Sequence, residues 1–305
     1  MLTGFKKIGL EDKNLIEKYH SRIVVPFYWH SFVELYTRKW SFYYKEMEDC
    51  LVILKKQHLH QPVLYLVCPP ISYKGSLSDE LFIIDEFRKR GINTNVLDIY
   101  RGFNQINNLT KTPYSEFIYS PSDYIEMKGT EFRGLRNEYN QGEKNRKGLI
   151  FYNTIDNETA VIANSFYKEW HKIRSNYDYL SLMNVSVLLQ NKERLIFNIV
   201  CTDDRKMVYM SLIEKLNDLS YCYIFRCNDF SKISNIRYPN QWGFVLDMKR
   251  ISNKNPLVNM GVGGDSLQDA YKRMLHPYRE SKIYCTGSKV VDRELWNSFG
   301  NNKLF

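Results

Sequence analysis

The chain has 305 residues, and hydrophobic residues make up 44% of them, which excludes a wholly disordered protein. Lysine and arginine total 43 against 34 acidic residues, which gives a formal net charge of +9 at pH 7. This excess favours a phosphate-rich partner such as nucleic acid, a nucleotide or an anionic membrane surface, although an ordinary solvated surface would give the same composition. The length fits about two domains.

The six cysteines are scattered without a Cys-x-x-Cys pair, and several lie in apolar runs. We therefore expect buried thiols rather than a disulfide framework. The first ten residues lack the apolar core of a signal peptide, and no apolar stretch approaches the roughly 18–20 residues that span a bilayer. These features predict a reduced, soluble, cytoplasmic protein.

The first half of the chain predicts helices, a hairpin, a further helix and a strand. Apolar spacing indicates helical segments at 15–19 and 31–40, and the apolar runs 50–54 and 63–67 are typical of a hairpin. A helix follows from Ser78 as its N-cap and ends at Gly91. Residues 95–99 then form a strand, so strand, helix and strand follow one another as in a crossover unit.

The second half repeats this order. The expected elements, in chain order, are a helix capped at 156–157, a hairpin of strands 183–189 and 195–200, a helix at 206–216, strands at 221–226 and 242–248, and a helix at 266–275. A polar loop is expected at 228–240. The order predicts a mixed α/β fold with two GNAT-like (N-acetyltransferase-like) halves, residues 1–145 and 146–305, each a mixed sheet flanked by helices.

Segment 119–140 carries a cluster of basic and amide side chains. Four of them follow the spacing i, i+3, i+4 and i+7, which is one face of a helix: Arg133, Arg136, Asn137 and Asn140. Lys128 precedes them. Guanidinium and amide groups on one face suit a phosphate or the 3′ end of a nucleic acid, whereas a merely exposed basic helix would show the same spacing.

Segment 259–278 has three glycines ahead of Asp265 and Ser266, which predicts a flexible turn that runs into a capped helix. Such a turn can approach an anion, although it is also an ordinary connection between a strand and a helix. The chain contains no G-x-G-x-x-G and no G-x-x-x-x-G-K-[ST] pattern, so glycine alone does not indicate a nucleotide site.

At these two segments the chain resembles the family of the phosphatidylglycerol lysyltransferase C-terminal domain. The residues that follow the family's first motif are Tyr119, Ser120, Asp123, Lys128, Gly129, Arg133, Arg136, Asn137 and Asn140. Those that follow its C-terminal motif are Asn259, Asp265, Leu267, Tyr271, Lys272 and Pro277. The resemblance implies two GNAT-like halves and transfer of an amino acid from aminoacyl-tRNA to a lipid or another acceptor.

The chain departs from the family in ways that bear on the acceptor. Met260 and Gly261 stand where the family has an acidic residue soon after Asn259. The integral-membrane part of the lipid enzymes has no counterpart in this sequence. The acceptor therefore stays open between a lipid, a peptide and a small molecule.

The resemblance also implies roles for particular residues. Lys128, Arg133, Arg136, Asn137 and Asn140 would hold the tRNA 3′ end or the donor phosphates. Asp265, Tyr271 and Lys272 are the catalytic candidates, and Asn259 would bind the acceptor. The donor is already an activated ester, so the enzyme would align the nucleophile, relay its proton and stabilise an oxyanion. No tightly bound cofactor and no metal are expected.

Segment 201–206 does not decide whether the donor is aminoacyl-tRNA or acyl-CoA. It follows a strand and enters an expected helix, where donor phosphates would meet backbone N–H groups, and Arg205 and Lys206 suit that role. It lacks the glycine-rich [QR]-x-x-G-x-[GA] loop of acyl-CoA users. The alternatives are an acyl-CoA-dependent N-acyltransferase and a non-catalytic RNA-binding module.

His58 and His60 could face one side of a strand as metal ligands, but no third ligand lies nearby.

Overall fold

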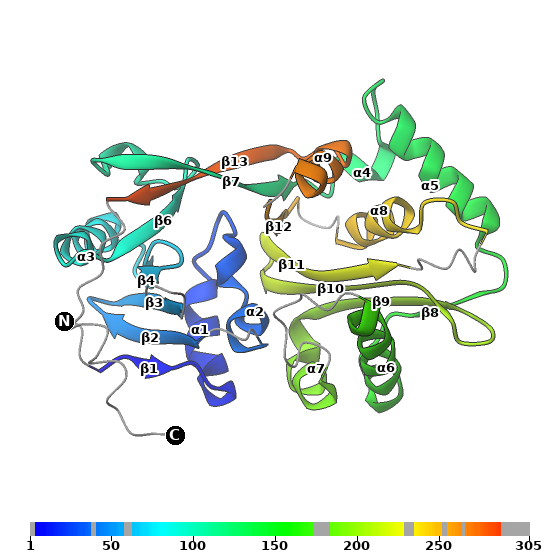
Figure 1. Ribbon diagram of the computed structural model, residues 1–305, viewed down its shortest axis with the longest axis horizontal. Helices are drawn as coiled ribbons and strands as arrows, with labels where there is room; N and C mark the ends of the chain where they lie inside the picture. Colours follow the sequence, from blue (N-terminus) through cyan, green and yellow to red (C-terminus); the bar gives the residue numbers. More distant parts are fainter. Residues whose placement is uncertain are drawn as a thin grey trace.

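The computed structural model describes residues 4–37, 41–57, 63–173, 184–228, 235–251, 255–263 and 266–287. In this part of the chain, thirteen strands join in one sheet, in the order β1-β2-β3-β4-β6-β13-β7-β12-β11-β10-β9-β8, with β5 beside β3. Helices cover the sheet (Figure 1). We call β1, β2, β3, β4 and β6 the first half-sheet, β8 to β12 the second half-sheet, and β7 with β13 the central pair.

The first half of the chain provides these elements: β1 (Lys6–Lys7), α1 (Lys13–His20), α2 (Phe32–Thr37), β2 (Ser41–Met47), β3 (Cys50–Gln57), β4 (Val63–Leu66), β5 (Ile71–Ser72), α3 (Leu77–Lys89), β6 (Asn93–Leu97) and β7 (Leu109–Tyr119). Strands β2, β3 and β4 are antiparallel, and α3 then crosses over to β6, which runs parallel to β4. Helix α3 is capped by Ser76, whose side chain accepts from Asp79 N, and not by Ser78 as expected.

The second half provides these elements: α4 (Asp123–Glu126), α5 (Arg133–Asn145), β8 (Leu149–Tyr152), α6 (Asn157–Ile173), α7 (Val185–Asn191), β9 (Leu195–Thr202), β10 (Met207–Asn217), β11 (Ser220–Asn228), α8 (Pro239–Ile251), β12 (Leu257–Val262), α9 (Ser266–Met274) and β13 (Arg279–Thr286). Strands β9, β10 and β11 are antiparallel, and α8 crosses over to β12, which runs parallel to β11. The second half therefore repeats the arrangement of the first.

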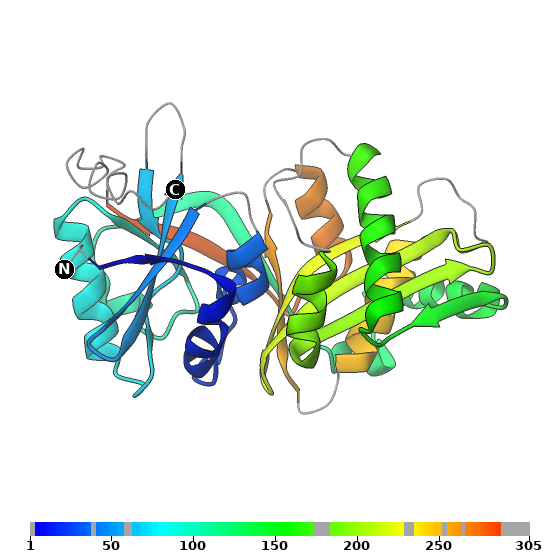
Figure 2. The same cartoon turned by 90° about the horizontal axis from the view of Figure 1, so that it is seen from below.

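The central pair joins the two half-sheets. Strand β13, near the end of the described chain, lies between β6 and β7, while β7 from the first half of the sequence pairs with β12. Figure 2 shows the two half-sheets side by side. The expected boundary at residue 145 stays a prediction, and strand pairing crosses it.

Three elements of the second half differ from the expectation. Residues 207–217 form strand β10, so the helix expected at 206–216 is wrong. Met210 and Leu212 pack in the core cluster that contains α6, whereas Ile213 packs in the cluster that contains α8. The strand is therefore apolar on both faces, and such a run cannot be told from a buried helix by its periodicity.

The strand expected at 242–248 is also wrong, because these residues lie in α8, the crossover helix. Trp242, Phe244, Val245 and Met248 are all buried, so the helix shows little amphipathic spacing. Likewise, the described part of the expected strand 183–189 begins helix α7, which Asn184 caps through a hydrogen bond from Ser186 N to its side chain. None of the described helices is long and apolar enough to cross a membrane.

Two glycines of α5 test how this helix is held. A Cβ at Gly142 would lie 2.2 Å from the ring of Trp242, whereas a Cβ at Gly134 meets nothing within 4 Å. We expect Gly142→Ala to destabilise the fold by about 1–3 kcal/mol, because overpacking forces α5 away from α8. Gly134→Ala should stabilise it by about 0.5–1 kcal/mol. Urea unfolding of both variants measures this, and equal effects would contradict the packing of α5 on α8.

Candidate active site

The second half-sheet opens where β11 and β12 separate. These parallel strands pair only at Ser220–Leu257, Tyr221–Val258 and Cys222–Asn259 among the described residues, although β11 continues to Asn228. In open α/β sheets, ligands bind at such a divergence of parallel strands, outside their carboxyl ends. We therefore expect a ligand site at the residues of β11 beyond Cys222 and at the elements that face them.

Arg226 of β11 and Tyr271 of α9 meet at this divergence. The guanidinium carbon of Arg226 lies 4.4 Å from the centroid of the Tyr271 ring. The Nη1 atom of Arg226 and the Oη atom of Tyr271 are buried and, apart from the interaction of these two side chains with each other, have no hydrogen-bond partner among the described residues. Orphaned buried polar groups of this kind cost about 1–3 kcal/mol each and are rare in native proteins. Their presence together indicates a place for a polar ligand.

Burial raises the pKa of Tyr271, while the positive charge of Arg226 opposes this shift. The phenol therefore stays neutral near pH 7 and can give a proton as well as receive one.

A buried carboxylate lies behind Arg226. Asp247 of α8 accepts hydrogen bonds from the hydroxyls of Tyr209 at 2.6 Å and Ser211 at 3.0 Å, and from Tyr223 and Asn198. Burial raises the pKa of Asp247. The hydroxyls of Tyr209 and Tyr223 also lie 2.5 Å apart. This network holds the ring of Tyr223, whose centroid lies 5.9 Å from the guanidinium carbon of Arg226.

Segments 119–140 and 259–278 meet beside this site. The hydroxyl of Tyr119 donates to the backbone oxygen of Lys272 at 2.9 Å, and that of Tyr124 donates to Leu275 O at 2.6 Å. Both tyrosines are fully buried. The tyrosines that open the first motif therefore hold the C-terminal end of α9, the helix that carries Tyr271.

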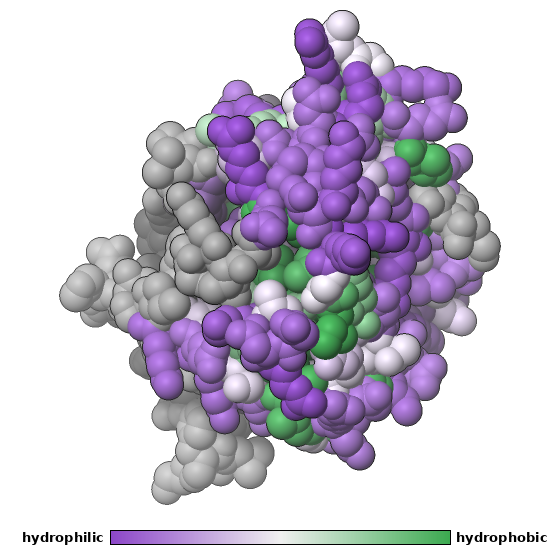
Figure 3. All heavy atoms as spheres, turned by 90° about the vertical axis from the view of Figure 1, so that its right-hand side faces the viewer, coloured by the Kyte–Doolittle hydropathy of each residue, from purple (hydrophilic) through white to green (hydrophobic). Residues whose placement is uncertain are grey.

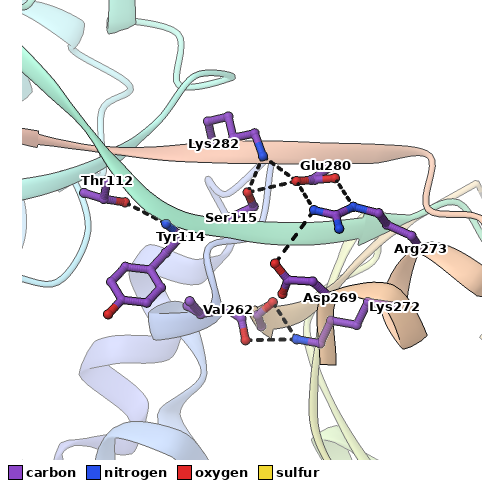
Figure 4. A network of polar contacts seen from close by, with 10 residues as sticks. Thr112, Tyr114, Ser115, Val262, Asp269, Lys272, Arg273, Glu280 and Lys282 are labelled. Carbon is purple, nitrogen blue, oxygen red and sulfur yellow. Dashed lines mark hydrogen bonds and ion pairs between the residues drawn. The ribbon is translucent and has the colours of Figure 1, made fainter. Parts of the chain in front are cut away.

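Lys272 and Asn259 lie next to the site, and both side chains form hydrogen bonds within the protein. Lys272 Nζ donates to the backbone oxygens of Met260, Gly261 and Val262, each at 3.0 Å. Figure 4 shows this ammonium group against the end of β12. Here the chain bends at Gly261, whose φ is +77° and whose Cβ would lie 2.8 Å from the Tyr28 ring.

Asn259 is fully buried where the two half-sheets meet. Its side-chain nitrogen donates to Pro26 O at 2.7 Å and to the carboxylate of Glu116, and its oxygen accepts from Gly261 N at 2.7 Å. Burial raises the pKa of Glu116 to about 7. Asn259 thus connects β12 with the segment before Tyr28 and with β7.

An ionic network fastens α9 to the central pair (Figure 4). Glu280 of β13 accepts from Arg273 of α9 at 2.8 and 2.9 Å and from Ser115 of β7 at 3.1 Å, and it also pairs with Lys282. The hydrogen bonds from Arg273, more than any other contact, lower the pKa of Glu280 to about 2. The network therefore stays ionised at neutral pH and fixes the helix that presents Tyr271.

The expected donor residues of segment 119–140 lie on or before α5. Arg133, Asn137 and Asn140 are exposed on this helix. Arg136 donates to the backbone oxygens of Met127 and Gly129, so part of its guanidinium holds the turn before α5. Lys128 is exposed and pairs with Glu126.

A basic cavity lies beyond the C-terminal end of α5. Its volume is about 540 Å3, and it is lined by Arg146, Lys147, Leu149, Phe151, Asn153, Asn198, Leu246 and Arg250. Arg250 donates to the side-chain oxygen of Asn198 at 2.7 Å, and Asn198 in turn donates to Asp247. Hydrogen bonds therefore connect this cavity with the surroundings of Arg226. Figure 3 looks onto this end of the molecule, where hydrophilic side chains surround a hydrophobic centre.

Arg205 and Lys206 lie in the turn between β9 and β10, so they do not stand at the start of a helix as expected. Arg205 is 3.6 Å from Glu158 and Lys206 is 2.8 Å from Asp204. In the second half-sheet the loop that enters the crossover helix is instead 229–238, between β11 and α8.

Asp265, His58 and His60 lie outside the described residues. In the part of the chain that is described, no group of three or more histidine, cysteine or acidic side chains is placed to hold a metal ion. All six cysteines are free thiols.

No family model and no curated protein sequence matches the chain. Solved structures do match it. A conserved protein of unknown function from Bacteroides thetaiotaomicron is 17% identical, with a TM-score of 0.65 over 92% of this chain and 98% of that one. L-PGS from Bacillus licheniformis is 12% identical, with a TM-score of 0.63 over 93% and 94%. The C-terminal domain of a protein described as a lysylphosphatidylglycerol synthetase from Agrobacterium fabrum is 10% identical, with a TM-score of 0.62 over 95% and 96%.

The chain has the fold of the lysylphosphatidylglycerol synthetase C-terminal domain. The resemblance predicted from segments 119–140 and 259–278 is confirmed at the level of the fold, and so is the mixed α/β class with two GNAT-like halves. At these identities the match extends to the path of the chain and not to a substrate.

Proposed function

We propose that this protein transfers an aminoacyl group from aminoacyl-tRNA to an amine or hydroxyl of a lipid, peptide or small-molecule acceptor. The observation that carries the proposal is the pair of Arg226 and Tyr271 where β11 and β12 separate, because the buried polar atoms of this pair have no further partner among the described residues. A guanidinium and a neutral phenol are the groups that acyl transfer from an ester requires, because one stabilises an oxyanion and the other moves a proton.

In this proposal the acceptor nitrogen or oxygen attacks the ester carbonyl carbon, and Arg226 Nη1 donates to the oxyanion that forms. The bond between the carbonyl carbon and the tRNA ribose oxygen then breaks. Tyr271 gives its proton to that oxygen and regains one from the attacking group, so the enzyme is unchanged. Lys272 and Asn259 would hold the bend of β12 beside the reacting groups, and Asp265 stays a predicted catalytic residue.

Two features favour tRNA over acyl-CoA as the donor. The sequence segments that precede the two crossover helices are residues 67–76 and 229–238, and neither carries a [QR]-x-x-G-x-[GA] sequence. The exposed side chains of α5 and the basic cavity beyond it place Arg133, Arg146 and Lys147 on one end of the molecule. A diphosphate alone needs a compact backbone cradle, whereas an RNA backbone needs cations spread over a surface.

The decisive experiment mixes the purified protein with a charged tRNA pool and candidate acceptors, and detects aminoacylated products by mass spectrometry. We expect products that disappear when RNase is added before the protein. A parallel reaction contains acyl-CoA as the sole donor. Turnover that resists RNase and needs only acyl-CoA would overturn the donor assignment, and no turnover with either donor while tRNA still binds would favour an RNA-binding module.

The RNA surface can be tested separately from catalysis. Arg133→Gln and Lys147→Gln should each weaken tRNA binding and reduce the slope of log Kd against log salt by about one unit, because each removes one phosphate contact. Filter binding over a salt series measures this. Arg90→Gln, which removes an exposed arginine at the end of α3, is the matched control and should leave the slope unchanged. Identical slopes in all variants would contradict the proposed surface.

A further inference from the structure

A second cavity lies in the first half of the chain, away from Arg226 and Tyr271. Its volume is about 290 Å3, roughly that of ten water molecules. It is lined by Arg22, Ile23, Val24, Val25, Phe27, His30, Pro69, Pro70, Ile71, Ser72, Gly75, Glu80, Ile99, Tyr100 and Arg101. These residues follow α1, β4 and β6. Strands β4 and β6 are parallel and pair only at Tyr65–Asn93 and Leu66–Thr94 among the described residues, so the cavity lies outside their carboxyl ends.

The lining of this cavity is mostly apolar, with Ser72 and Glu80 as buried polar residues. Phe27, Pro69, Pro70 and Ile71 are buried. His30, also buried, accepts a hydrogen bond from Phe27 N on Nδ1 at 3.1 Å. Burial lowers the pKa of His30 to about 3, so the ring is neutral and carries its proton on Nε2. That Nε2 atom has no hydrogen-bond partner among the described residues.

Three lining residues of this cavity are charged: two exposed arginines and the buried carboxylate of Glu80. Arg22 and Arg101 are both exposed lining residues. Arg101 is neutralised by Glu80 at 2.7 Å, and Glu80 also accepts from Ser72 N at 3.0 Å and from the hydroxyl of Tyr100 at 2.7 Å. Arg22 forms no ion pair with a described carboxylate and lies 5.2 Å from the centroid of the Tyr73 ring. One uncompensated guanidinium therefore stands at the mouth of an apolar cavity.

The same loop argues against a nucleotide diphosphate. Pro69 and Pro70 have no N–H to donate, and the first turn of α3 holds Asp79 and Glu80, which would repel an anion at that helix end. A mostly apolar cavity with one guanidinium outside that no described carboxylate pairs instead suits a ligand with an apolar chain and a single negative charge.

We propose that this cavity binds an amphipathic carboxylate, a medium-length aliphatic chain whose carboxylate pairs with Arg22 and whose chain enters among Val25, Ile71 and Ile99. A carboxylate matches one guanidinium in charge and can bind it through both oxygens. The inference does not depend on the proposed aminoacyl transfer, and the two can fail separately.

Isothermal titration of the full chain with decanoate, decyl phosphate and decanol, each below its micelle concentration, tests the proposal. We expect one decanoate per chain, bound about tenfold more tightly than decanol, because a charged hydrogen bond contributes about 1.5 kcal/mol or more. Decyl phosphate should bind more weakly than decanoate, because Arg22 offers one positive charge and Arg101 is already paired with Glu80. Tighter binding of decyl phosphate, or equal binding of decanol, would overturn the carboxylate assignment.

Variants test separately how Arg22 at the mouth and the apolar interior contribute to ligand binding. Arg22→Gln lies on the surface and should weaken decanoate about tenfold without changing decanol. Ile99→Trp should fill the cavity and abolish binding of all three compounds. Arg90→Gln is the matched arginine control. Unchanged decanoate binding in Ile99→Trp, with the variant folded by circular dichroism, would place the ligand elsewhere and refute the site.

Discussion

Arg226→Met is expected to lower the rate of aminoacyl transfer by about 100-fold or more, because it removes the group that stabilises the oxyanion. Methionine keeps much of the apolar volume of arginine, so the packing against Tyr271 and Phe244 should survive. Single-turnover transfer with saturating charged tRNA measures the chemical step directly. Arg226→Lys should recover part of the rate, since it restores a positive charge without the planar fork.

The control for this prediction is tRNA affinity, which should be the same in wild type, Arg226→Met and Arg226→Lys. A variant that loses binding and keeps its single-turnover rate would assign Arg226 to donor recognition instead. A rate within threefold of wild type in Arg226→Met would remove Arg226 from the chemistry altogether.

Glu214→Gln is expected to change how stability depends on pH. Glu214 of β10 is buried against α2, where it accepts from Ser31 Oγ at 2.6 Å, Phe32 N at 3.2 Å and Val33 N at 3.1 Å. Burial raises its pKa from the ordinary 4.5 to about 7, although these donors oppose the shift. The folded state therefore holds this proton more tightly than the unfolded state does, and the resulting stability is lost as the pH rises from about 4.5 through 7.

The free energy of unfolding of Glu214→Gln, measured relative to wild type, should therefore increase by about 2–3 kcal/mol between pH 5 and pH 8. Using the difference between the two proteins cancels the opposing contribution of His20 and His30, whose pKa values burial lowers. Urea unfolding at several pH values measures it. Glu116→Gln should behave in the same way, and Glu131→Gln, at an exposed position, is the control. A constant difference across this range would show that Glu214 is ionised throughout.

The sequence predicted the fold well where the hydrophobic spacing differs between the faces of an element. Helices α1, α3, α6 and α9 were expected close to their observed bounds for this reason. Residues 207–217 and 242–248 were exchanged between strand and helix because both are buried on all sides and carry no period. Because of this exchange, Arg205 and Lys206 were expected at the start of a helix, whereas they lie in a hairpin turn.

The candidate site, which stays a proposal, was named only in part from the sequence. Tyr271 was found through its motif, and Arg226 was missed because it ends an aromatic run that was interpreted as a core strand. An arginine within a run of buried strand residues was the available signal, since arginine is rarely buried without a partner. Asp247 was missed because its segment was assigned to a strand. The site joins β11, α8 and α9, and no local pattern shows that they meet.

The position of β13 has a consequence for how the molecule is made. Ile283 pairs with Leu97, and Tyr284 pairs with Val96, so the edge of the first half-sheet stays open until the ribosome has reached this last strand. At about 5–20 residues per second, β6 waits roughly 10–40 s for its neighbour. A nascent chain that exposes a strand edge for so long is open to pairing with other chains and to capture by chaperones. Each half-sheet is therefore completed only when a strand from the other half of the chain pairs with it.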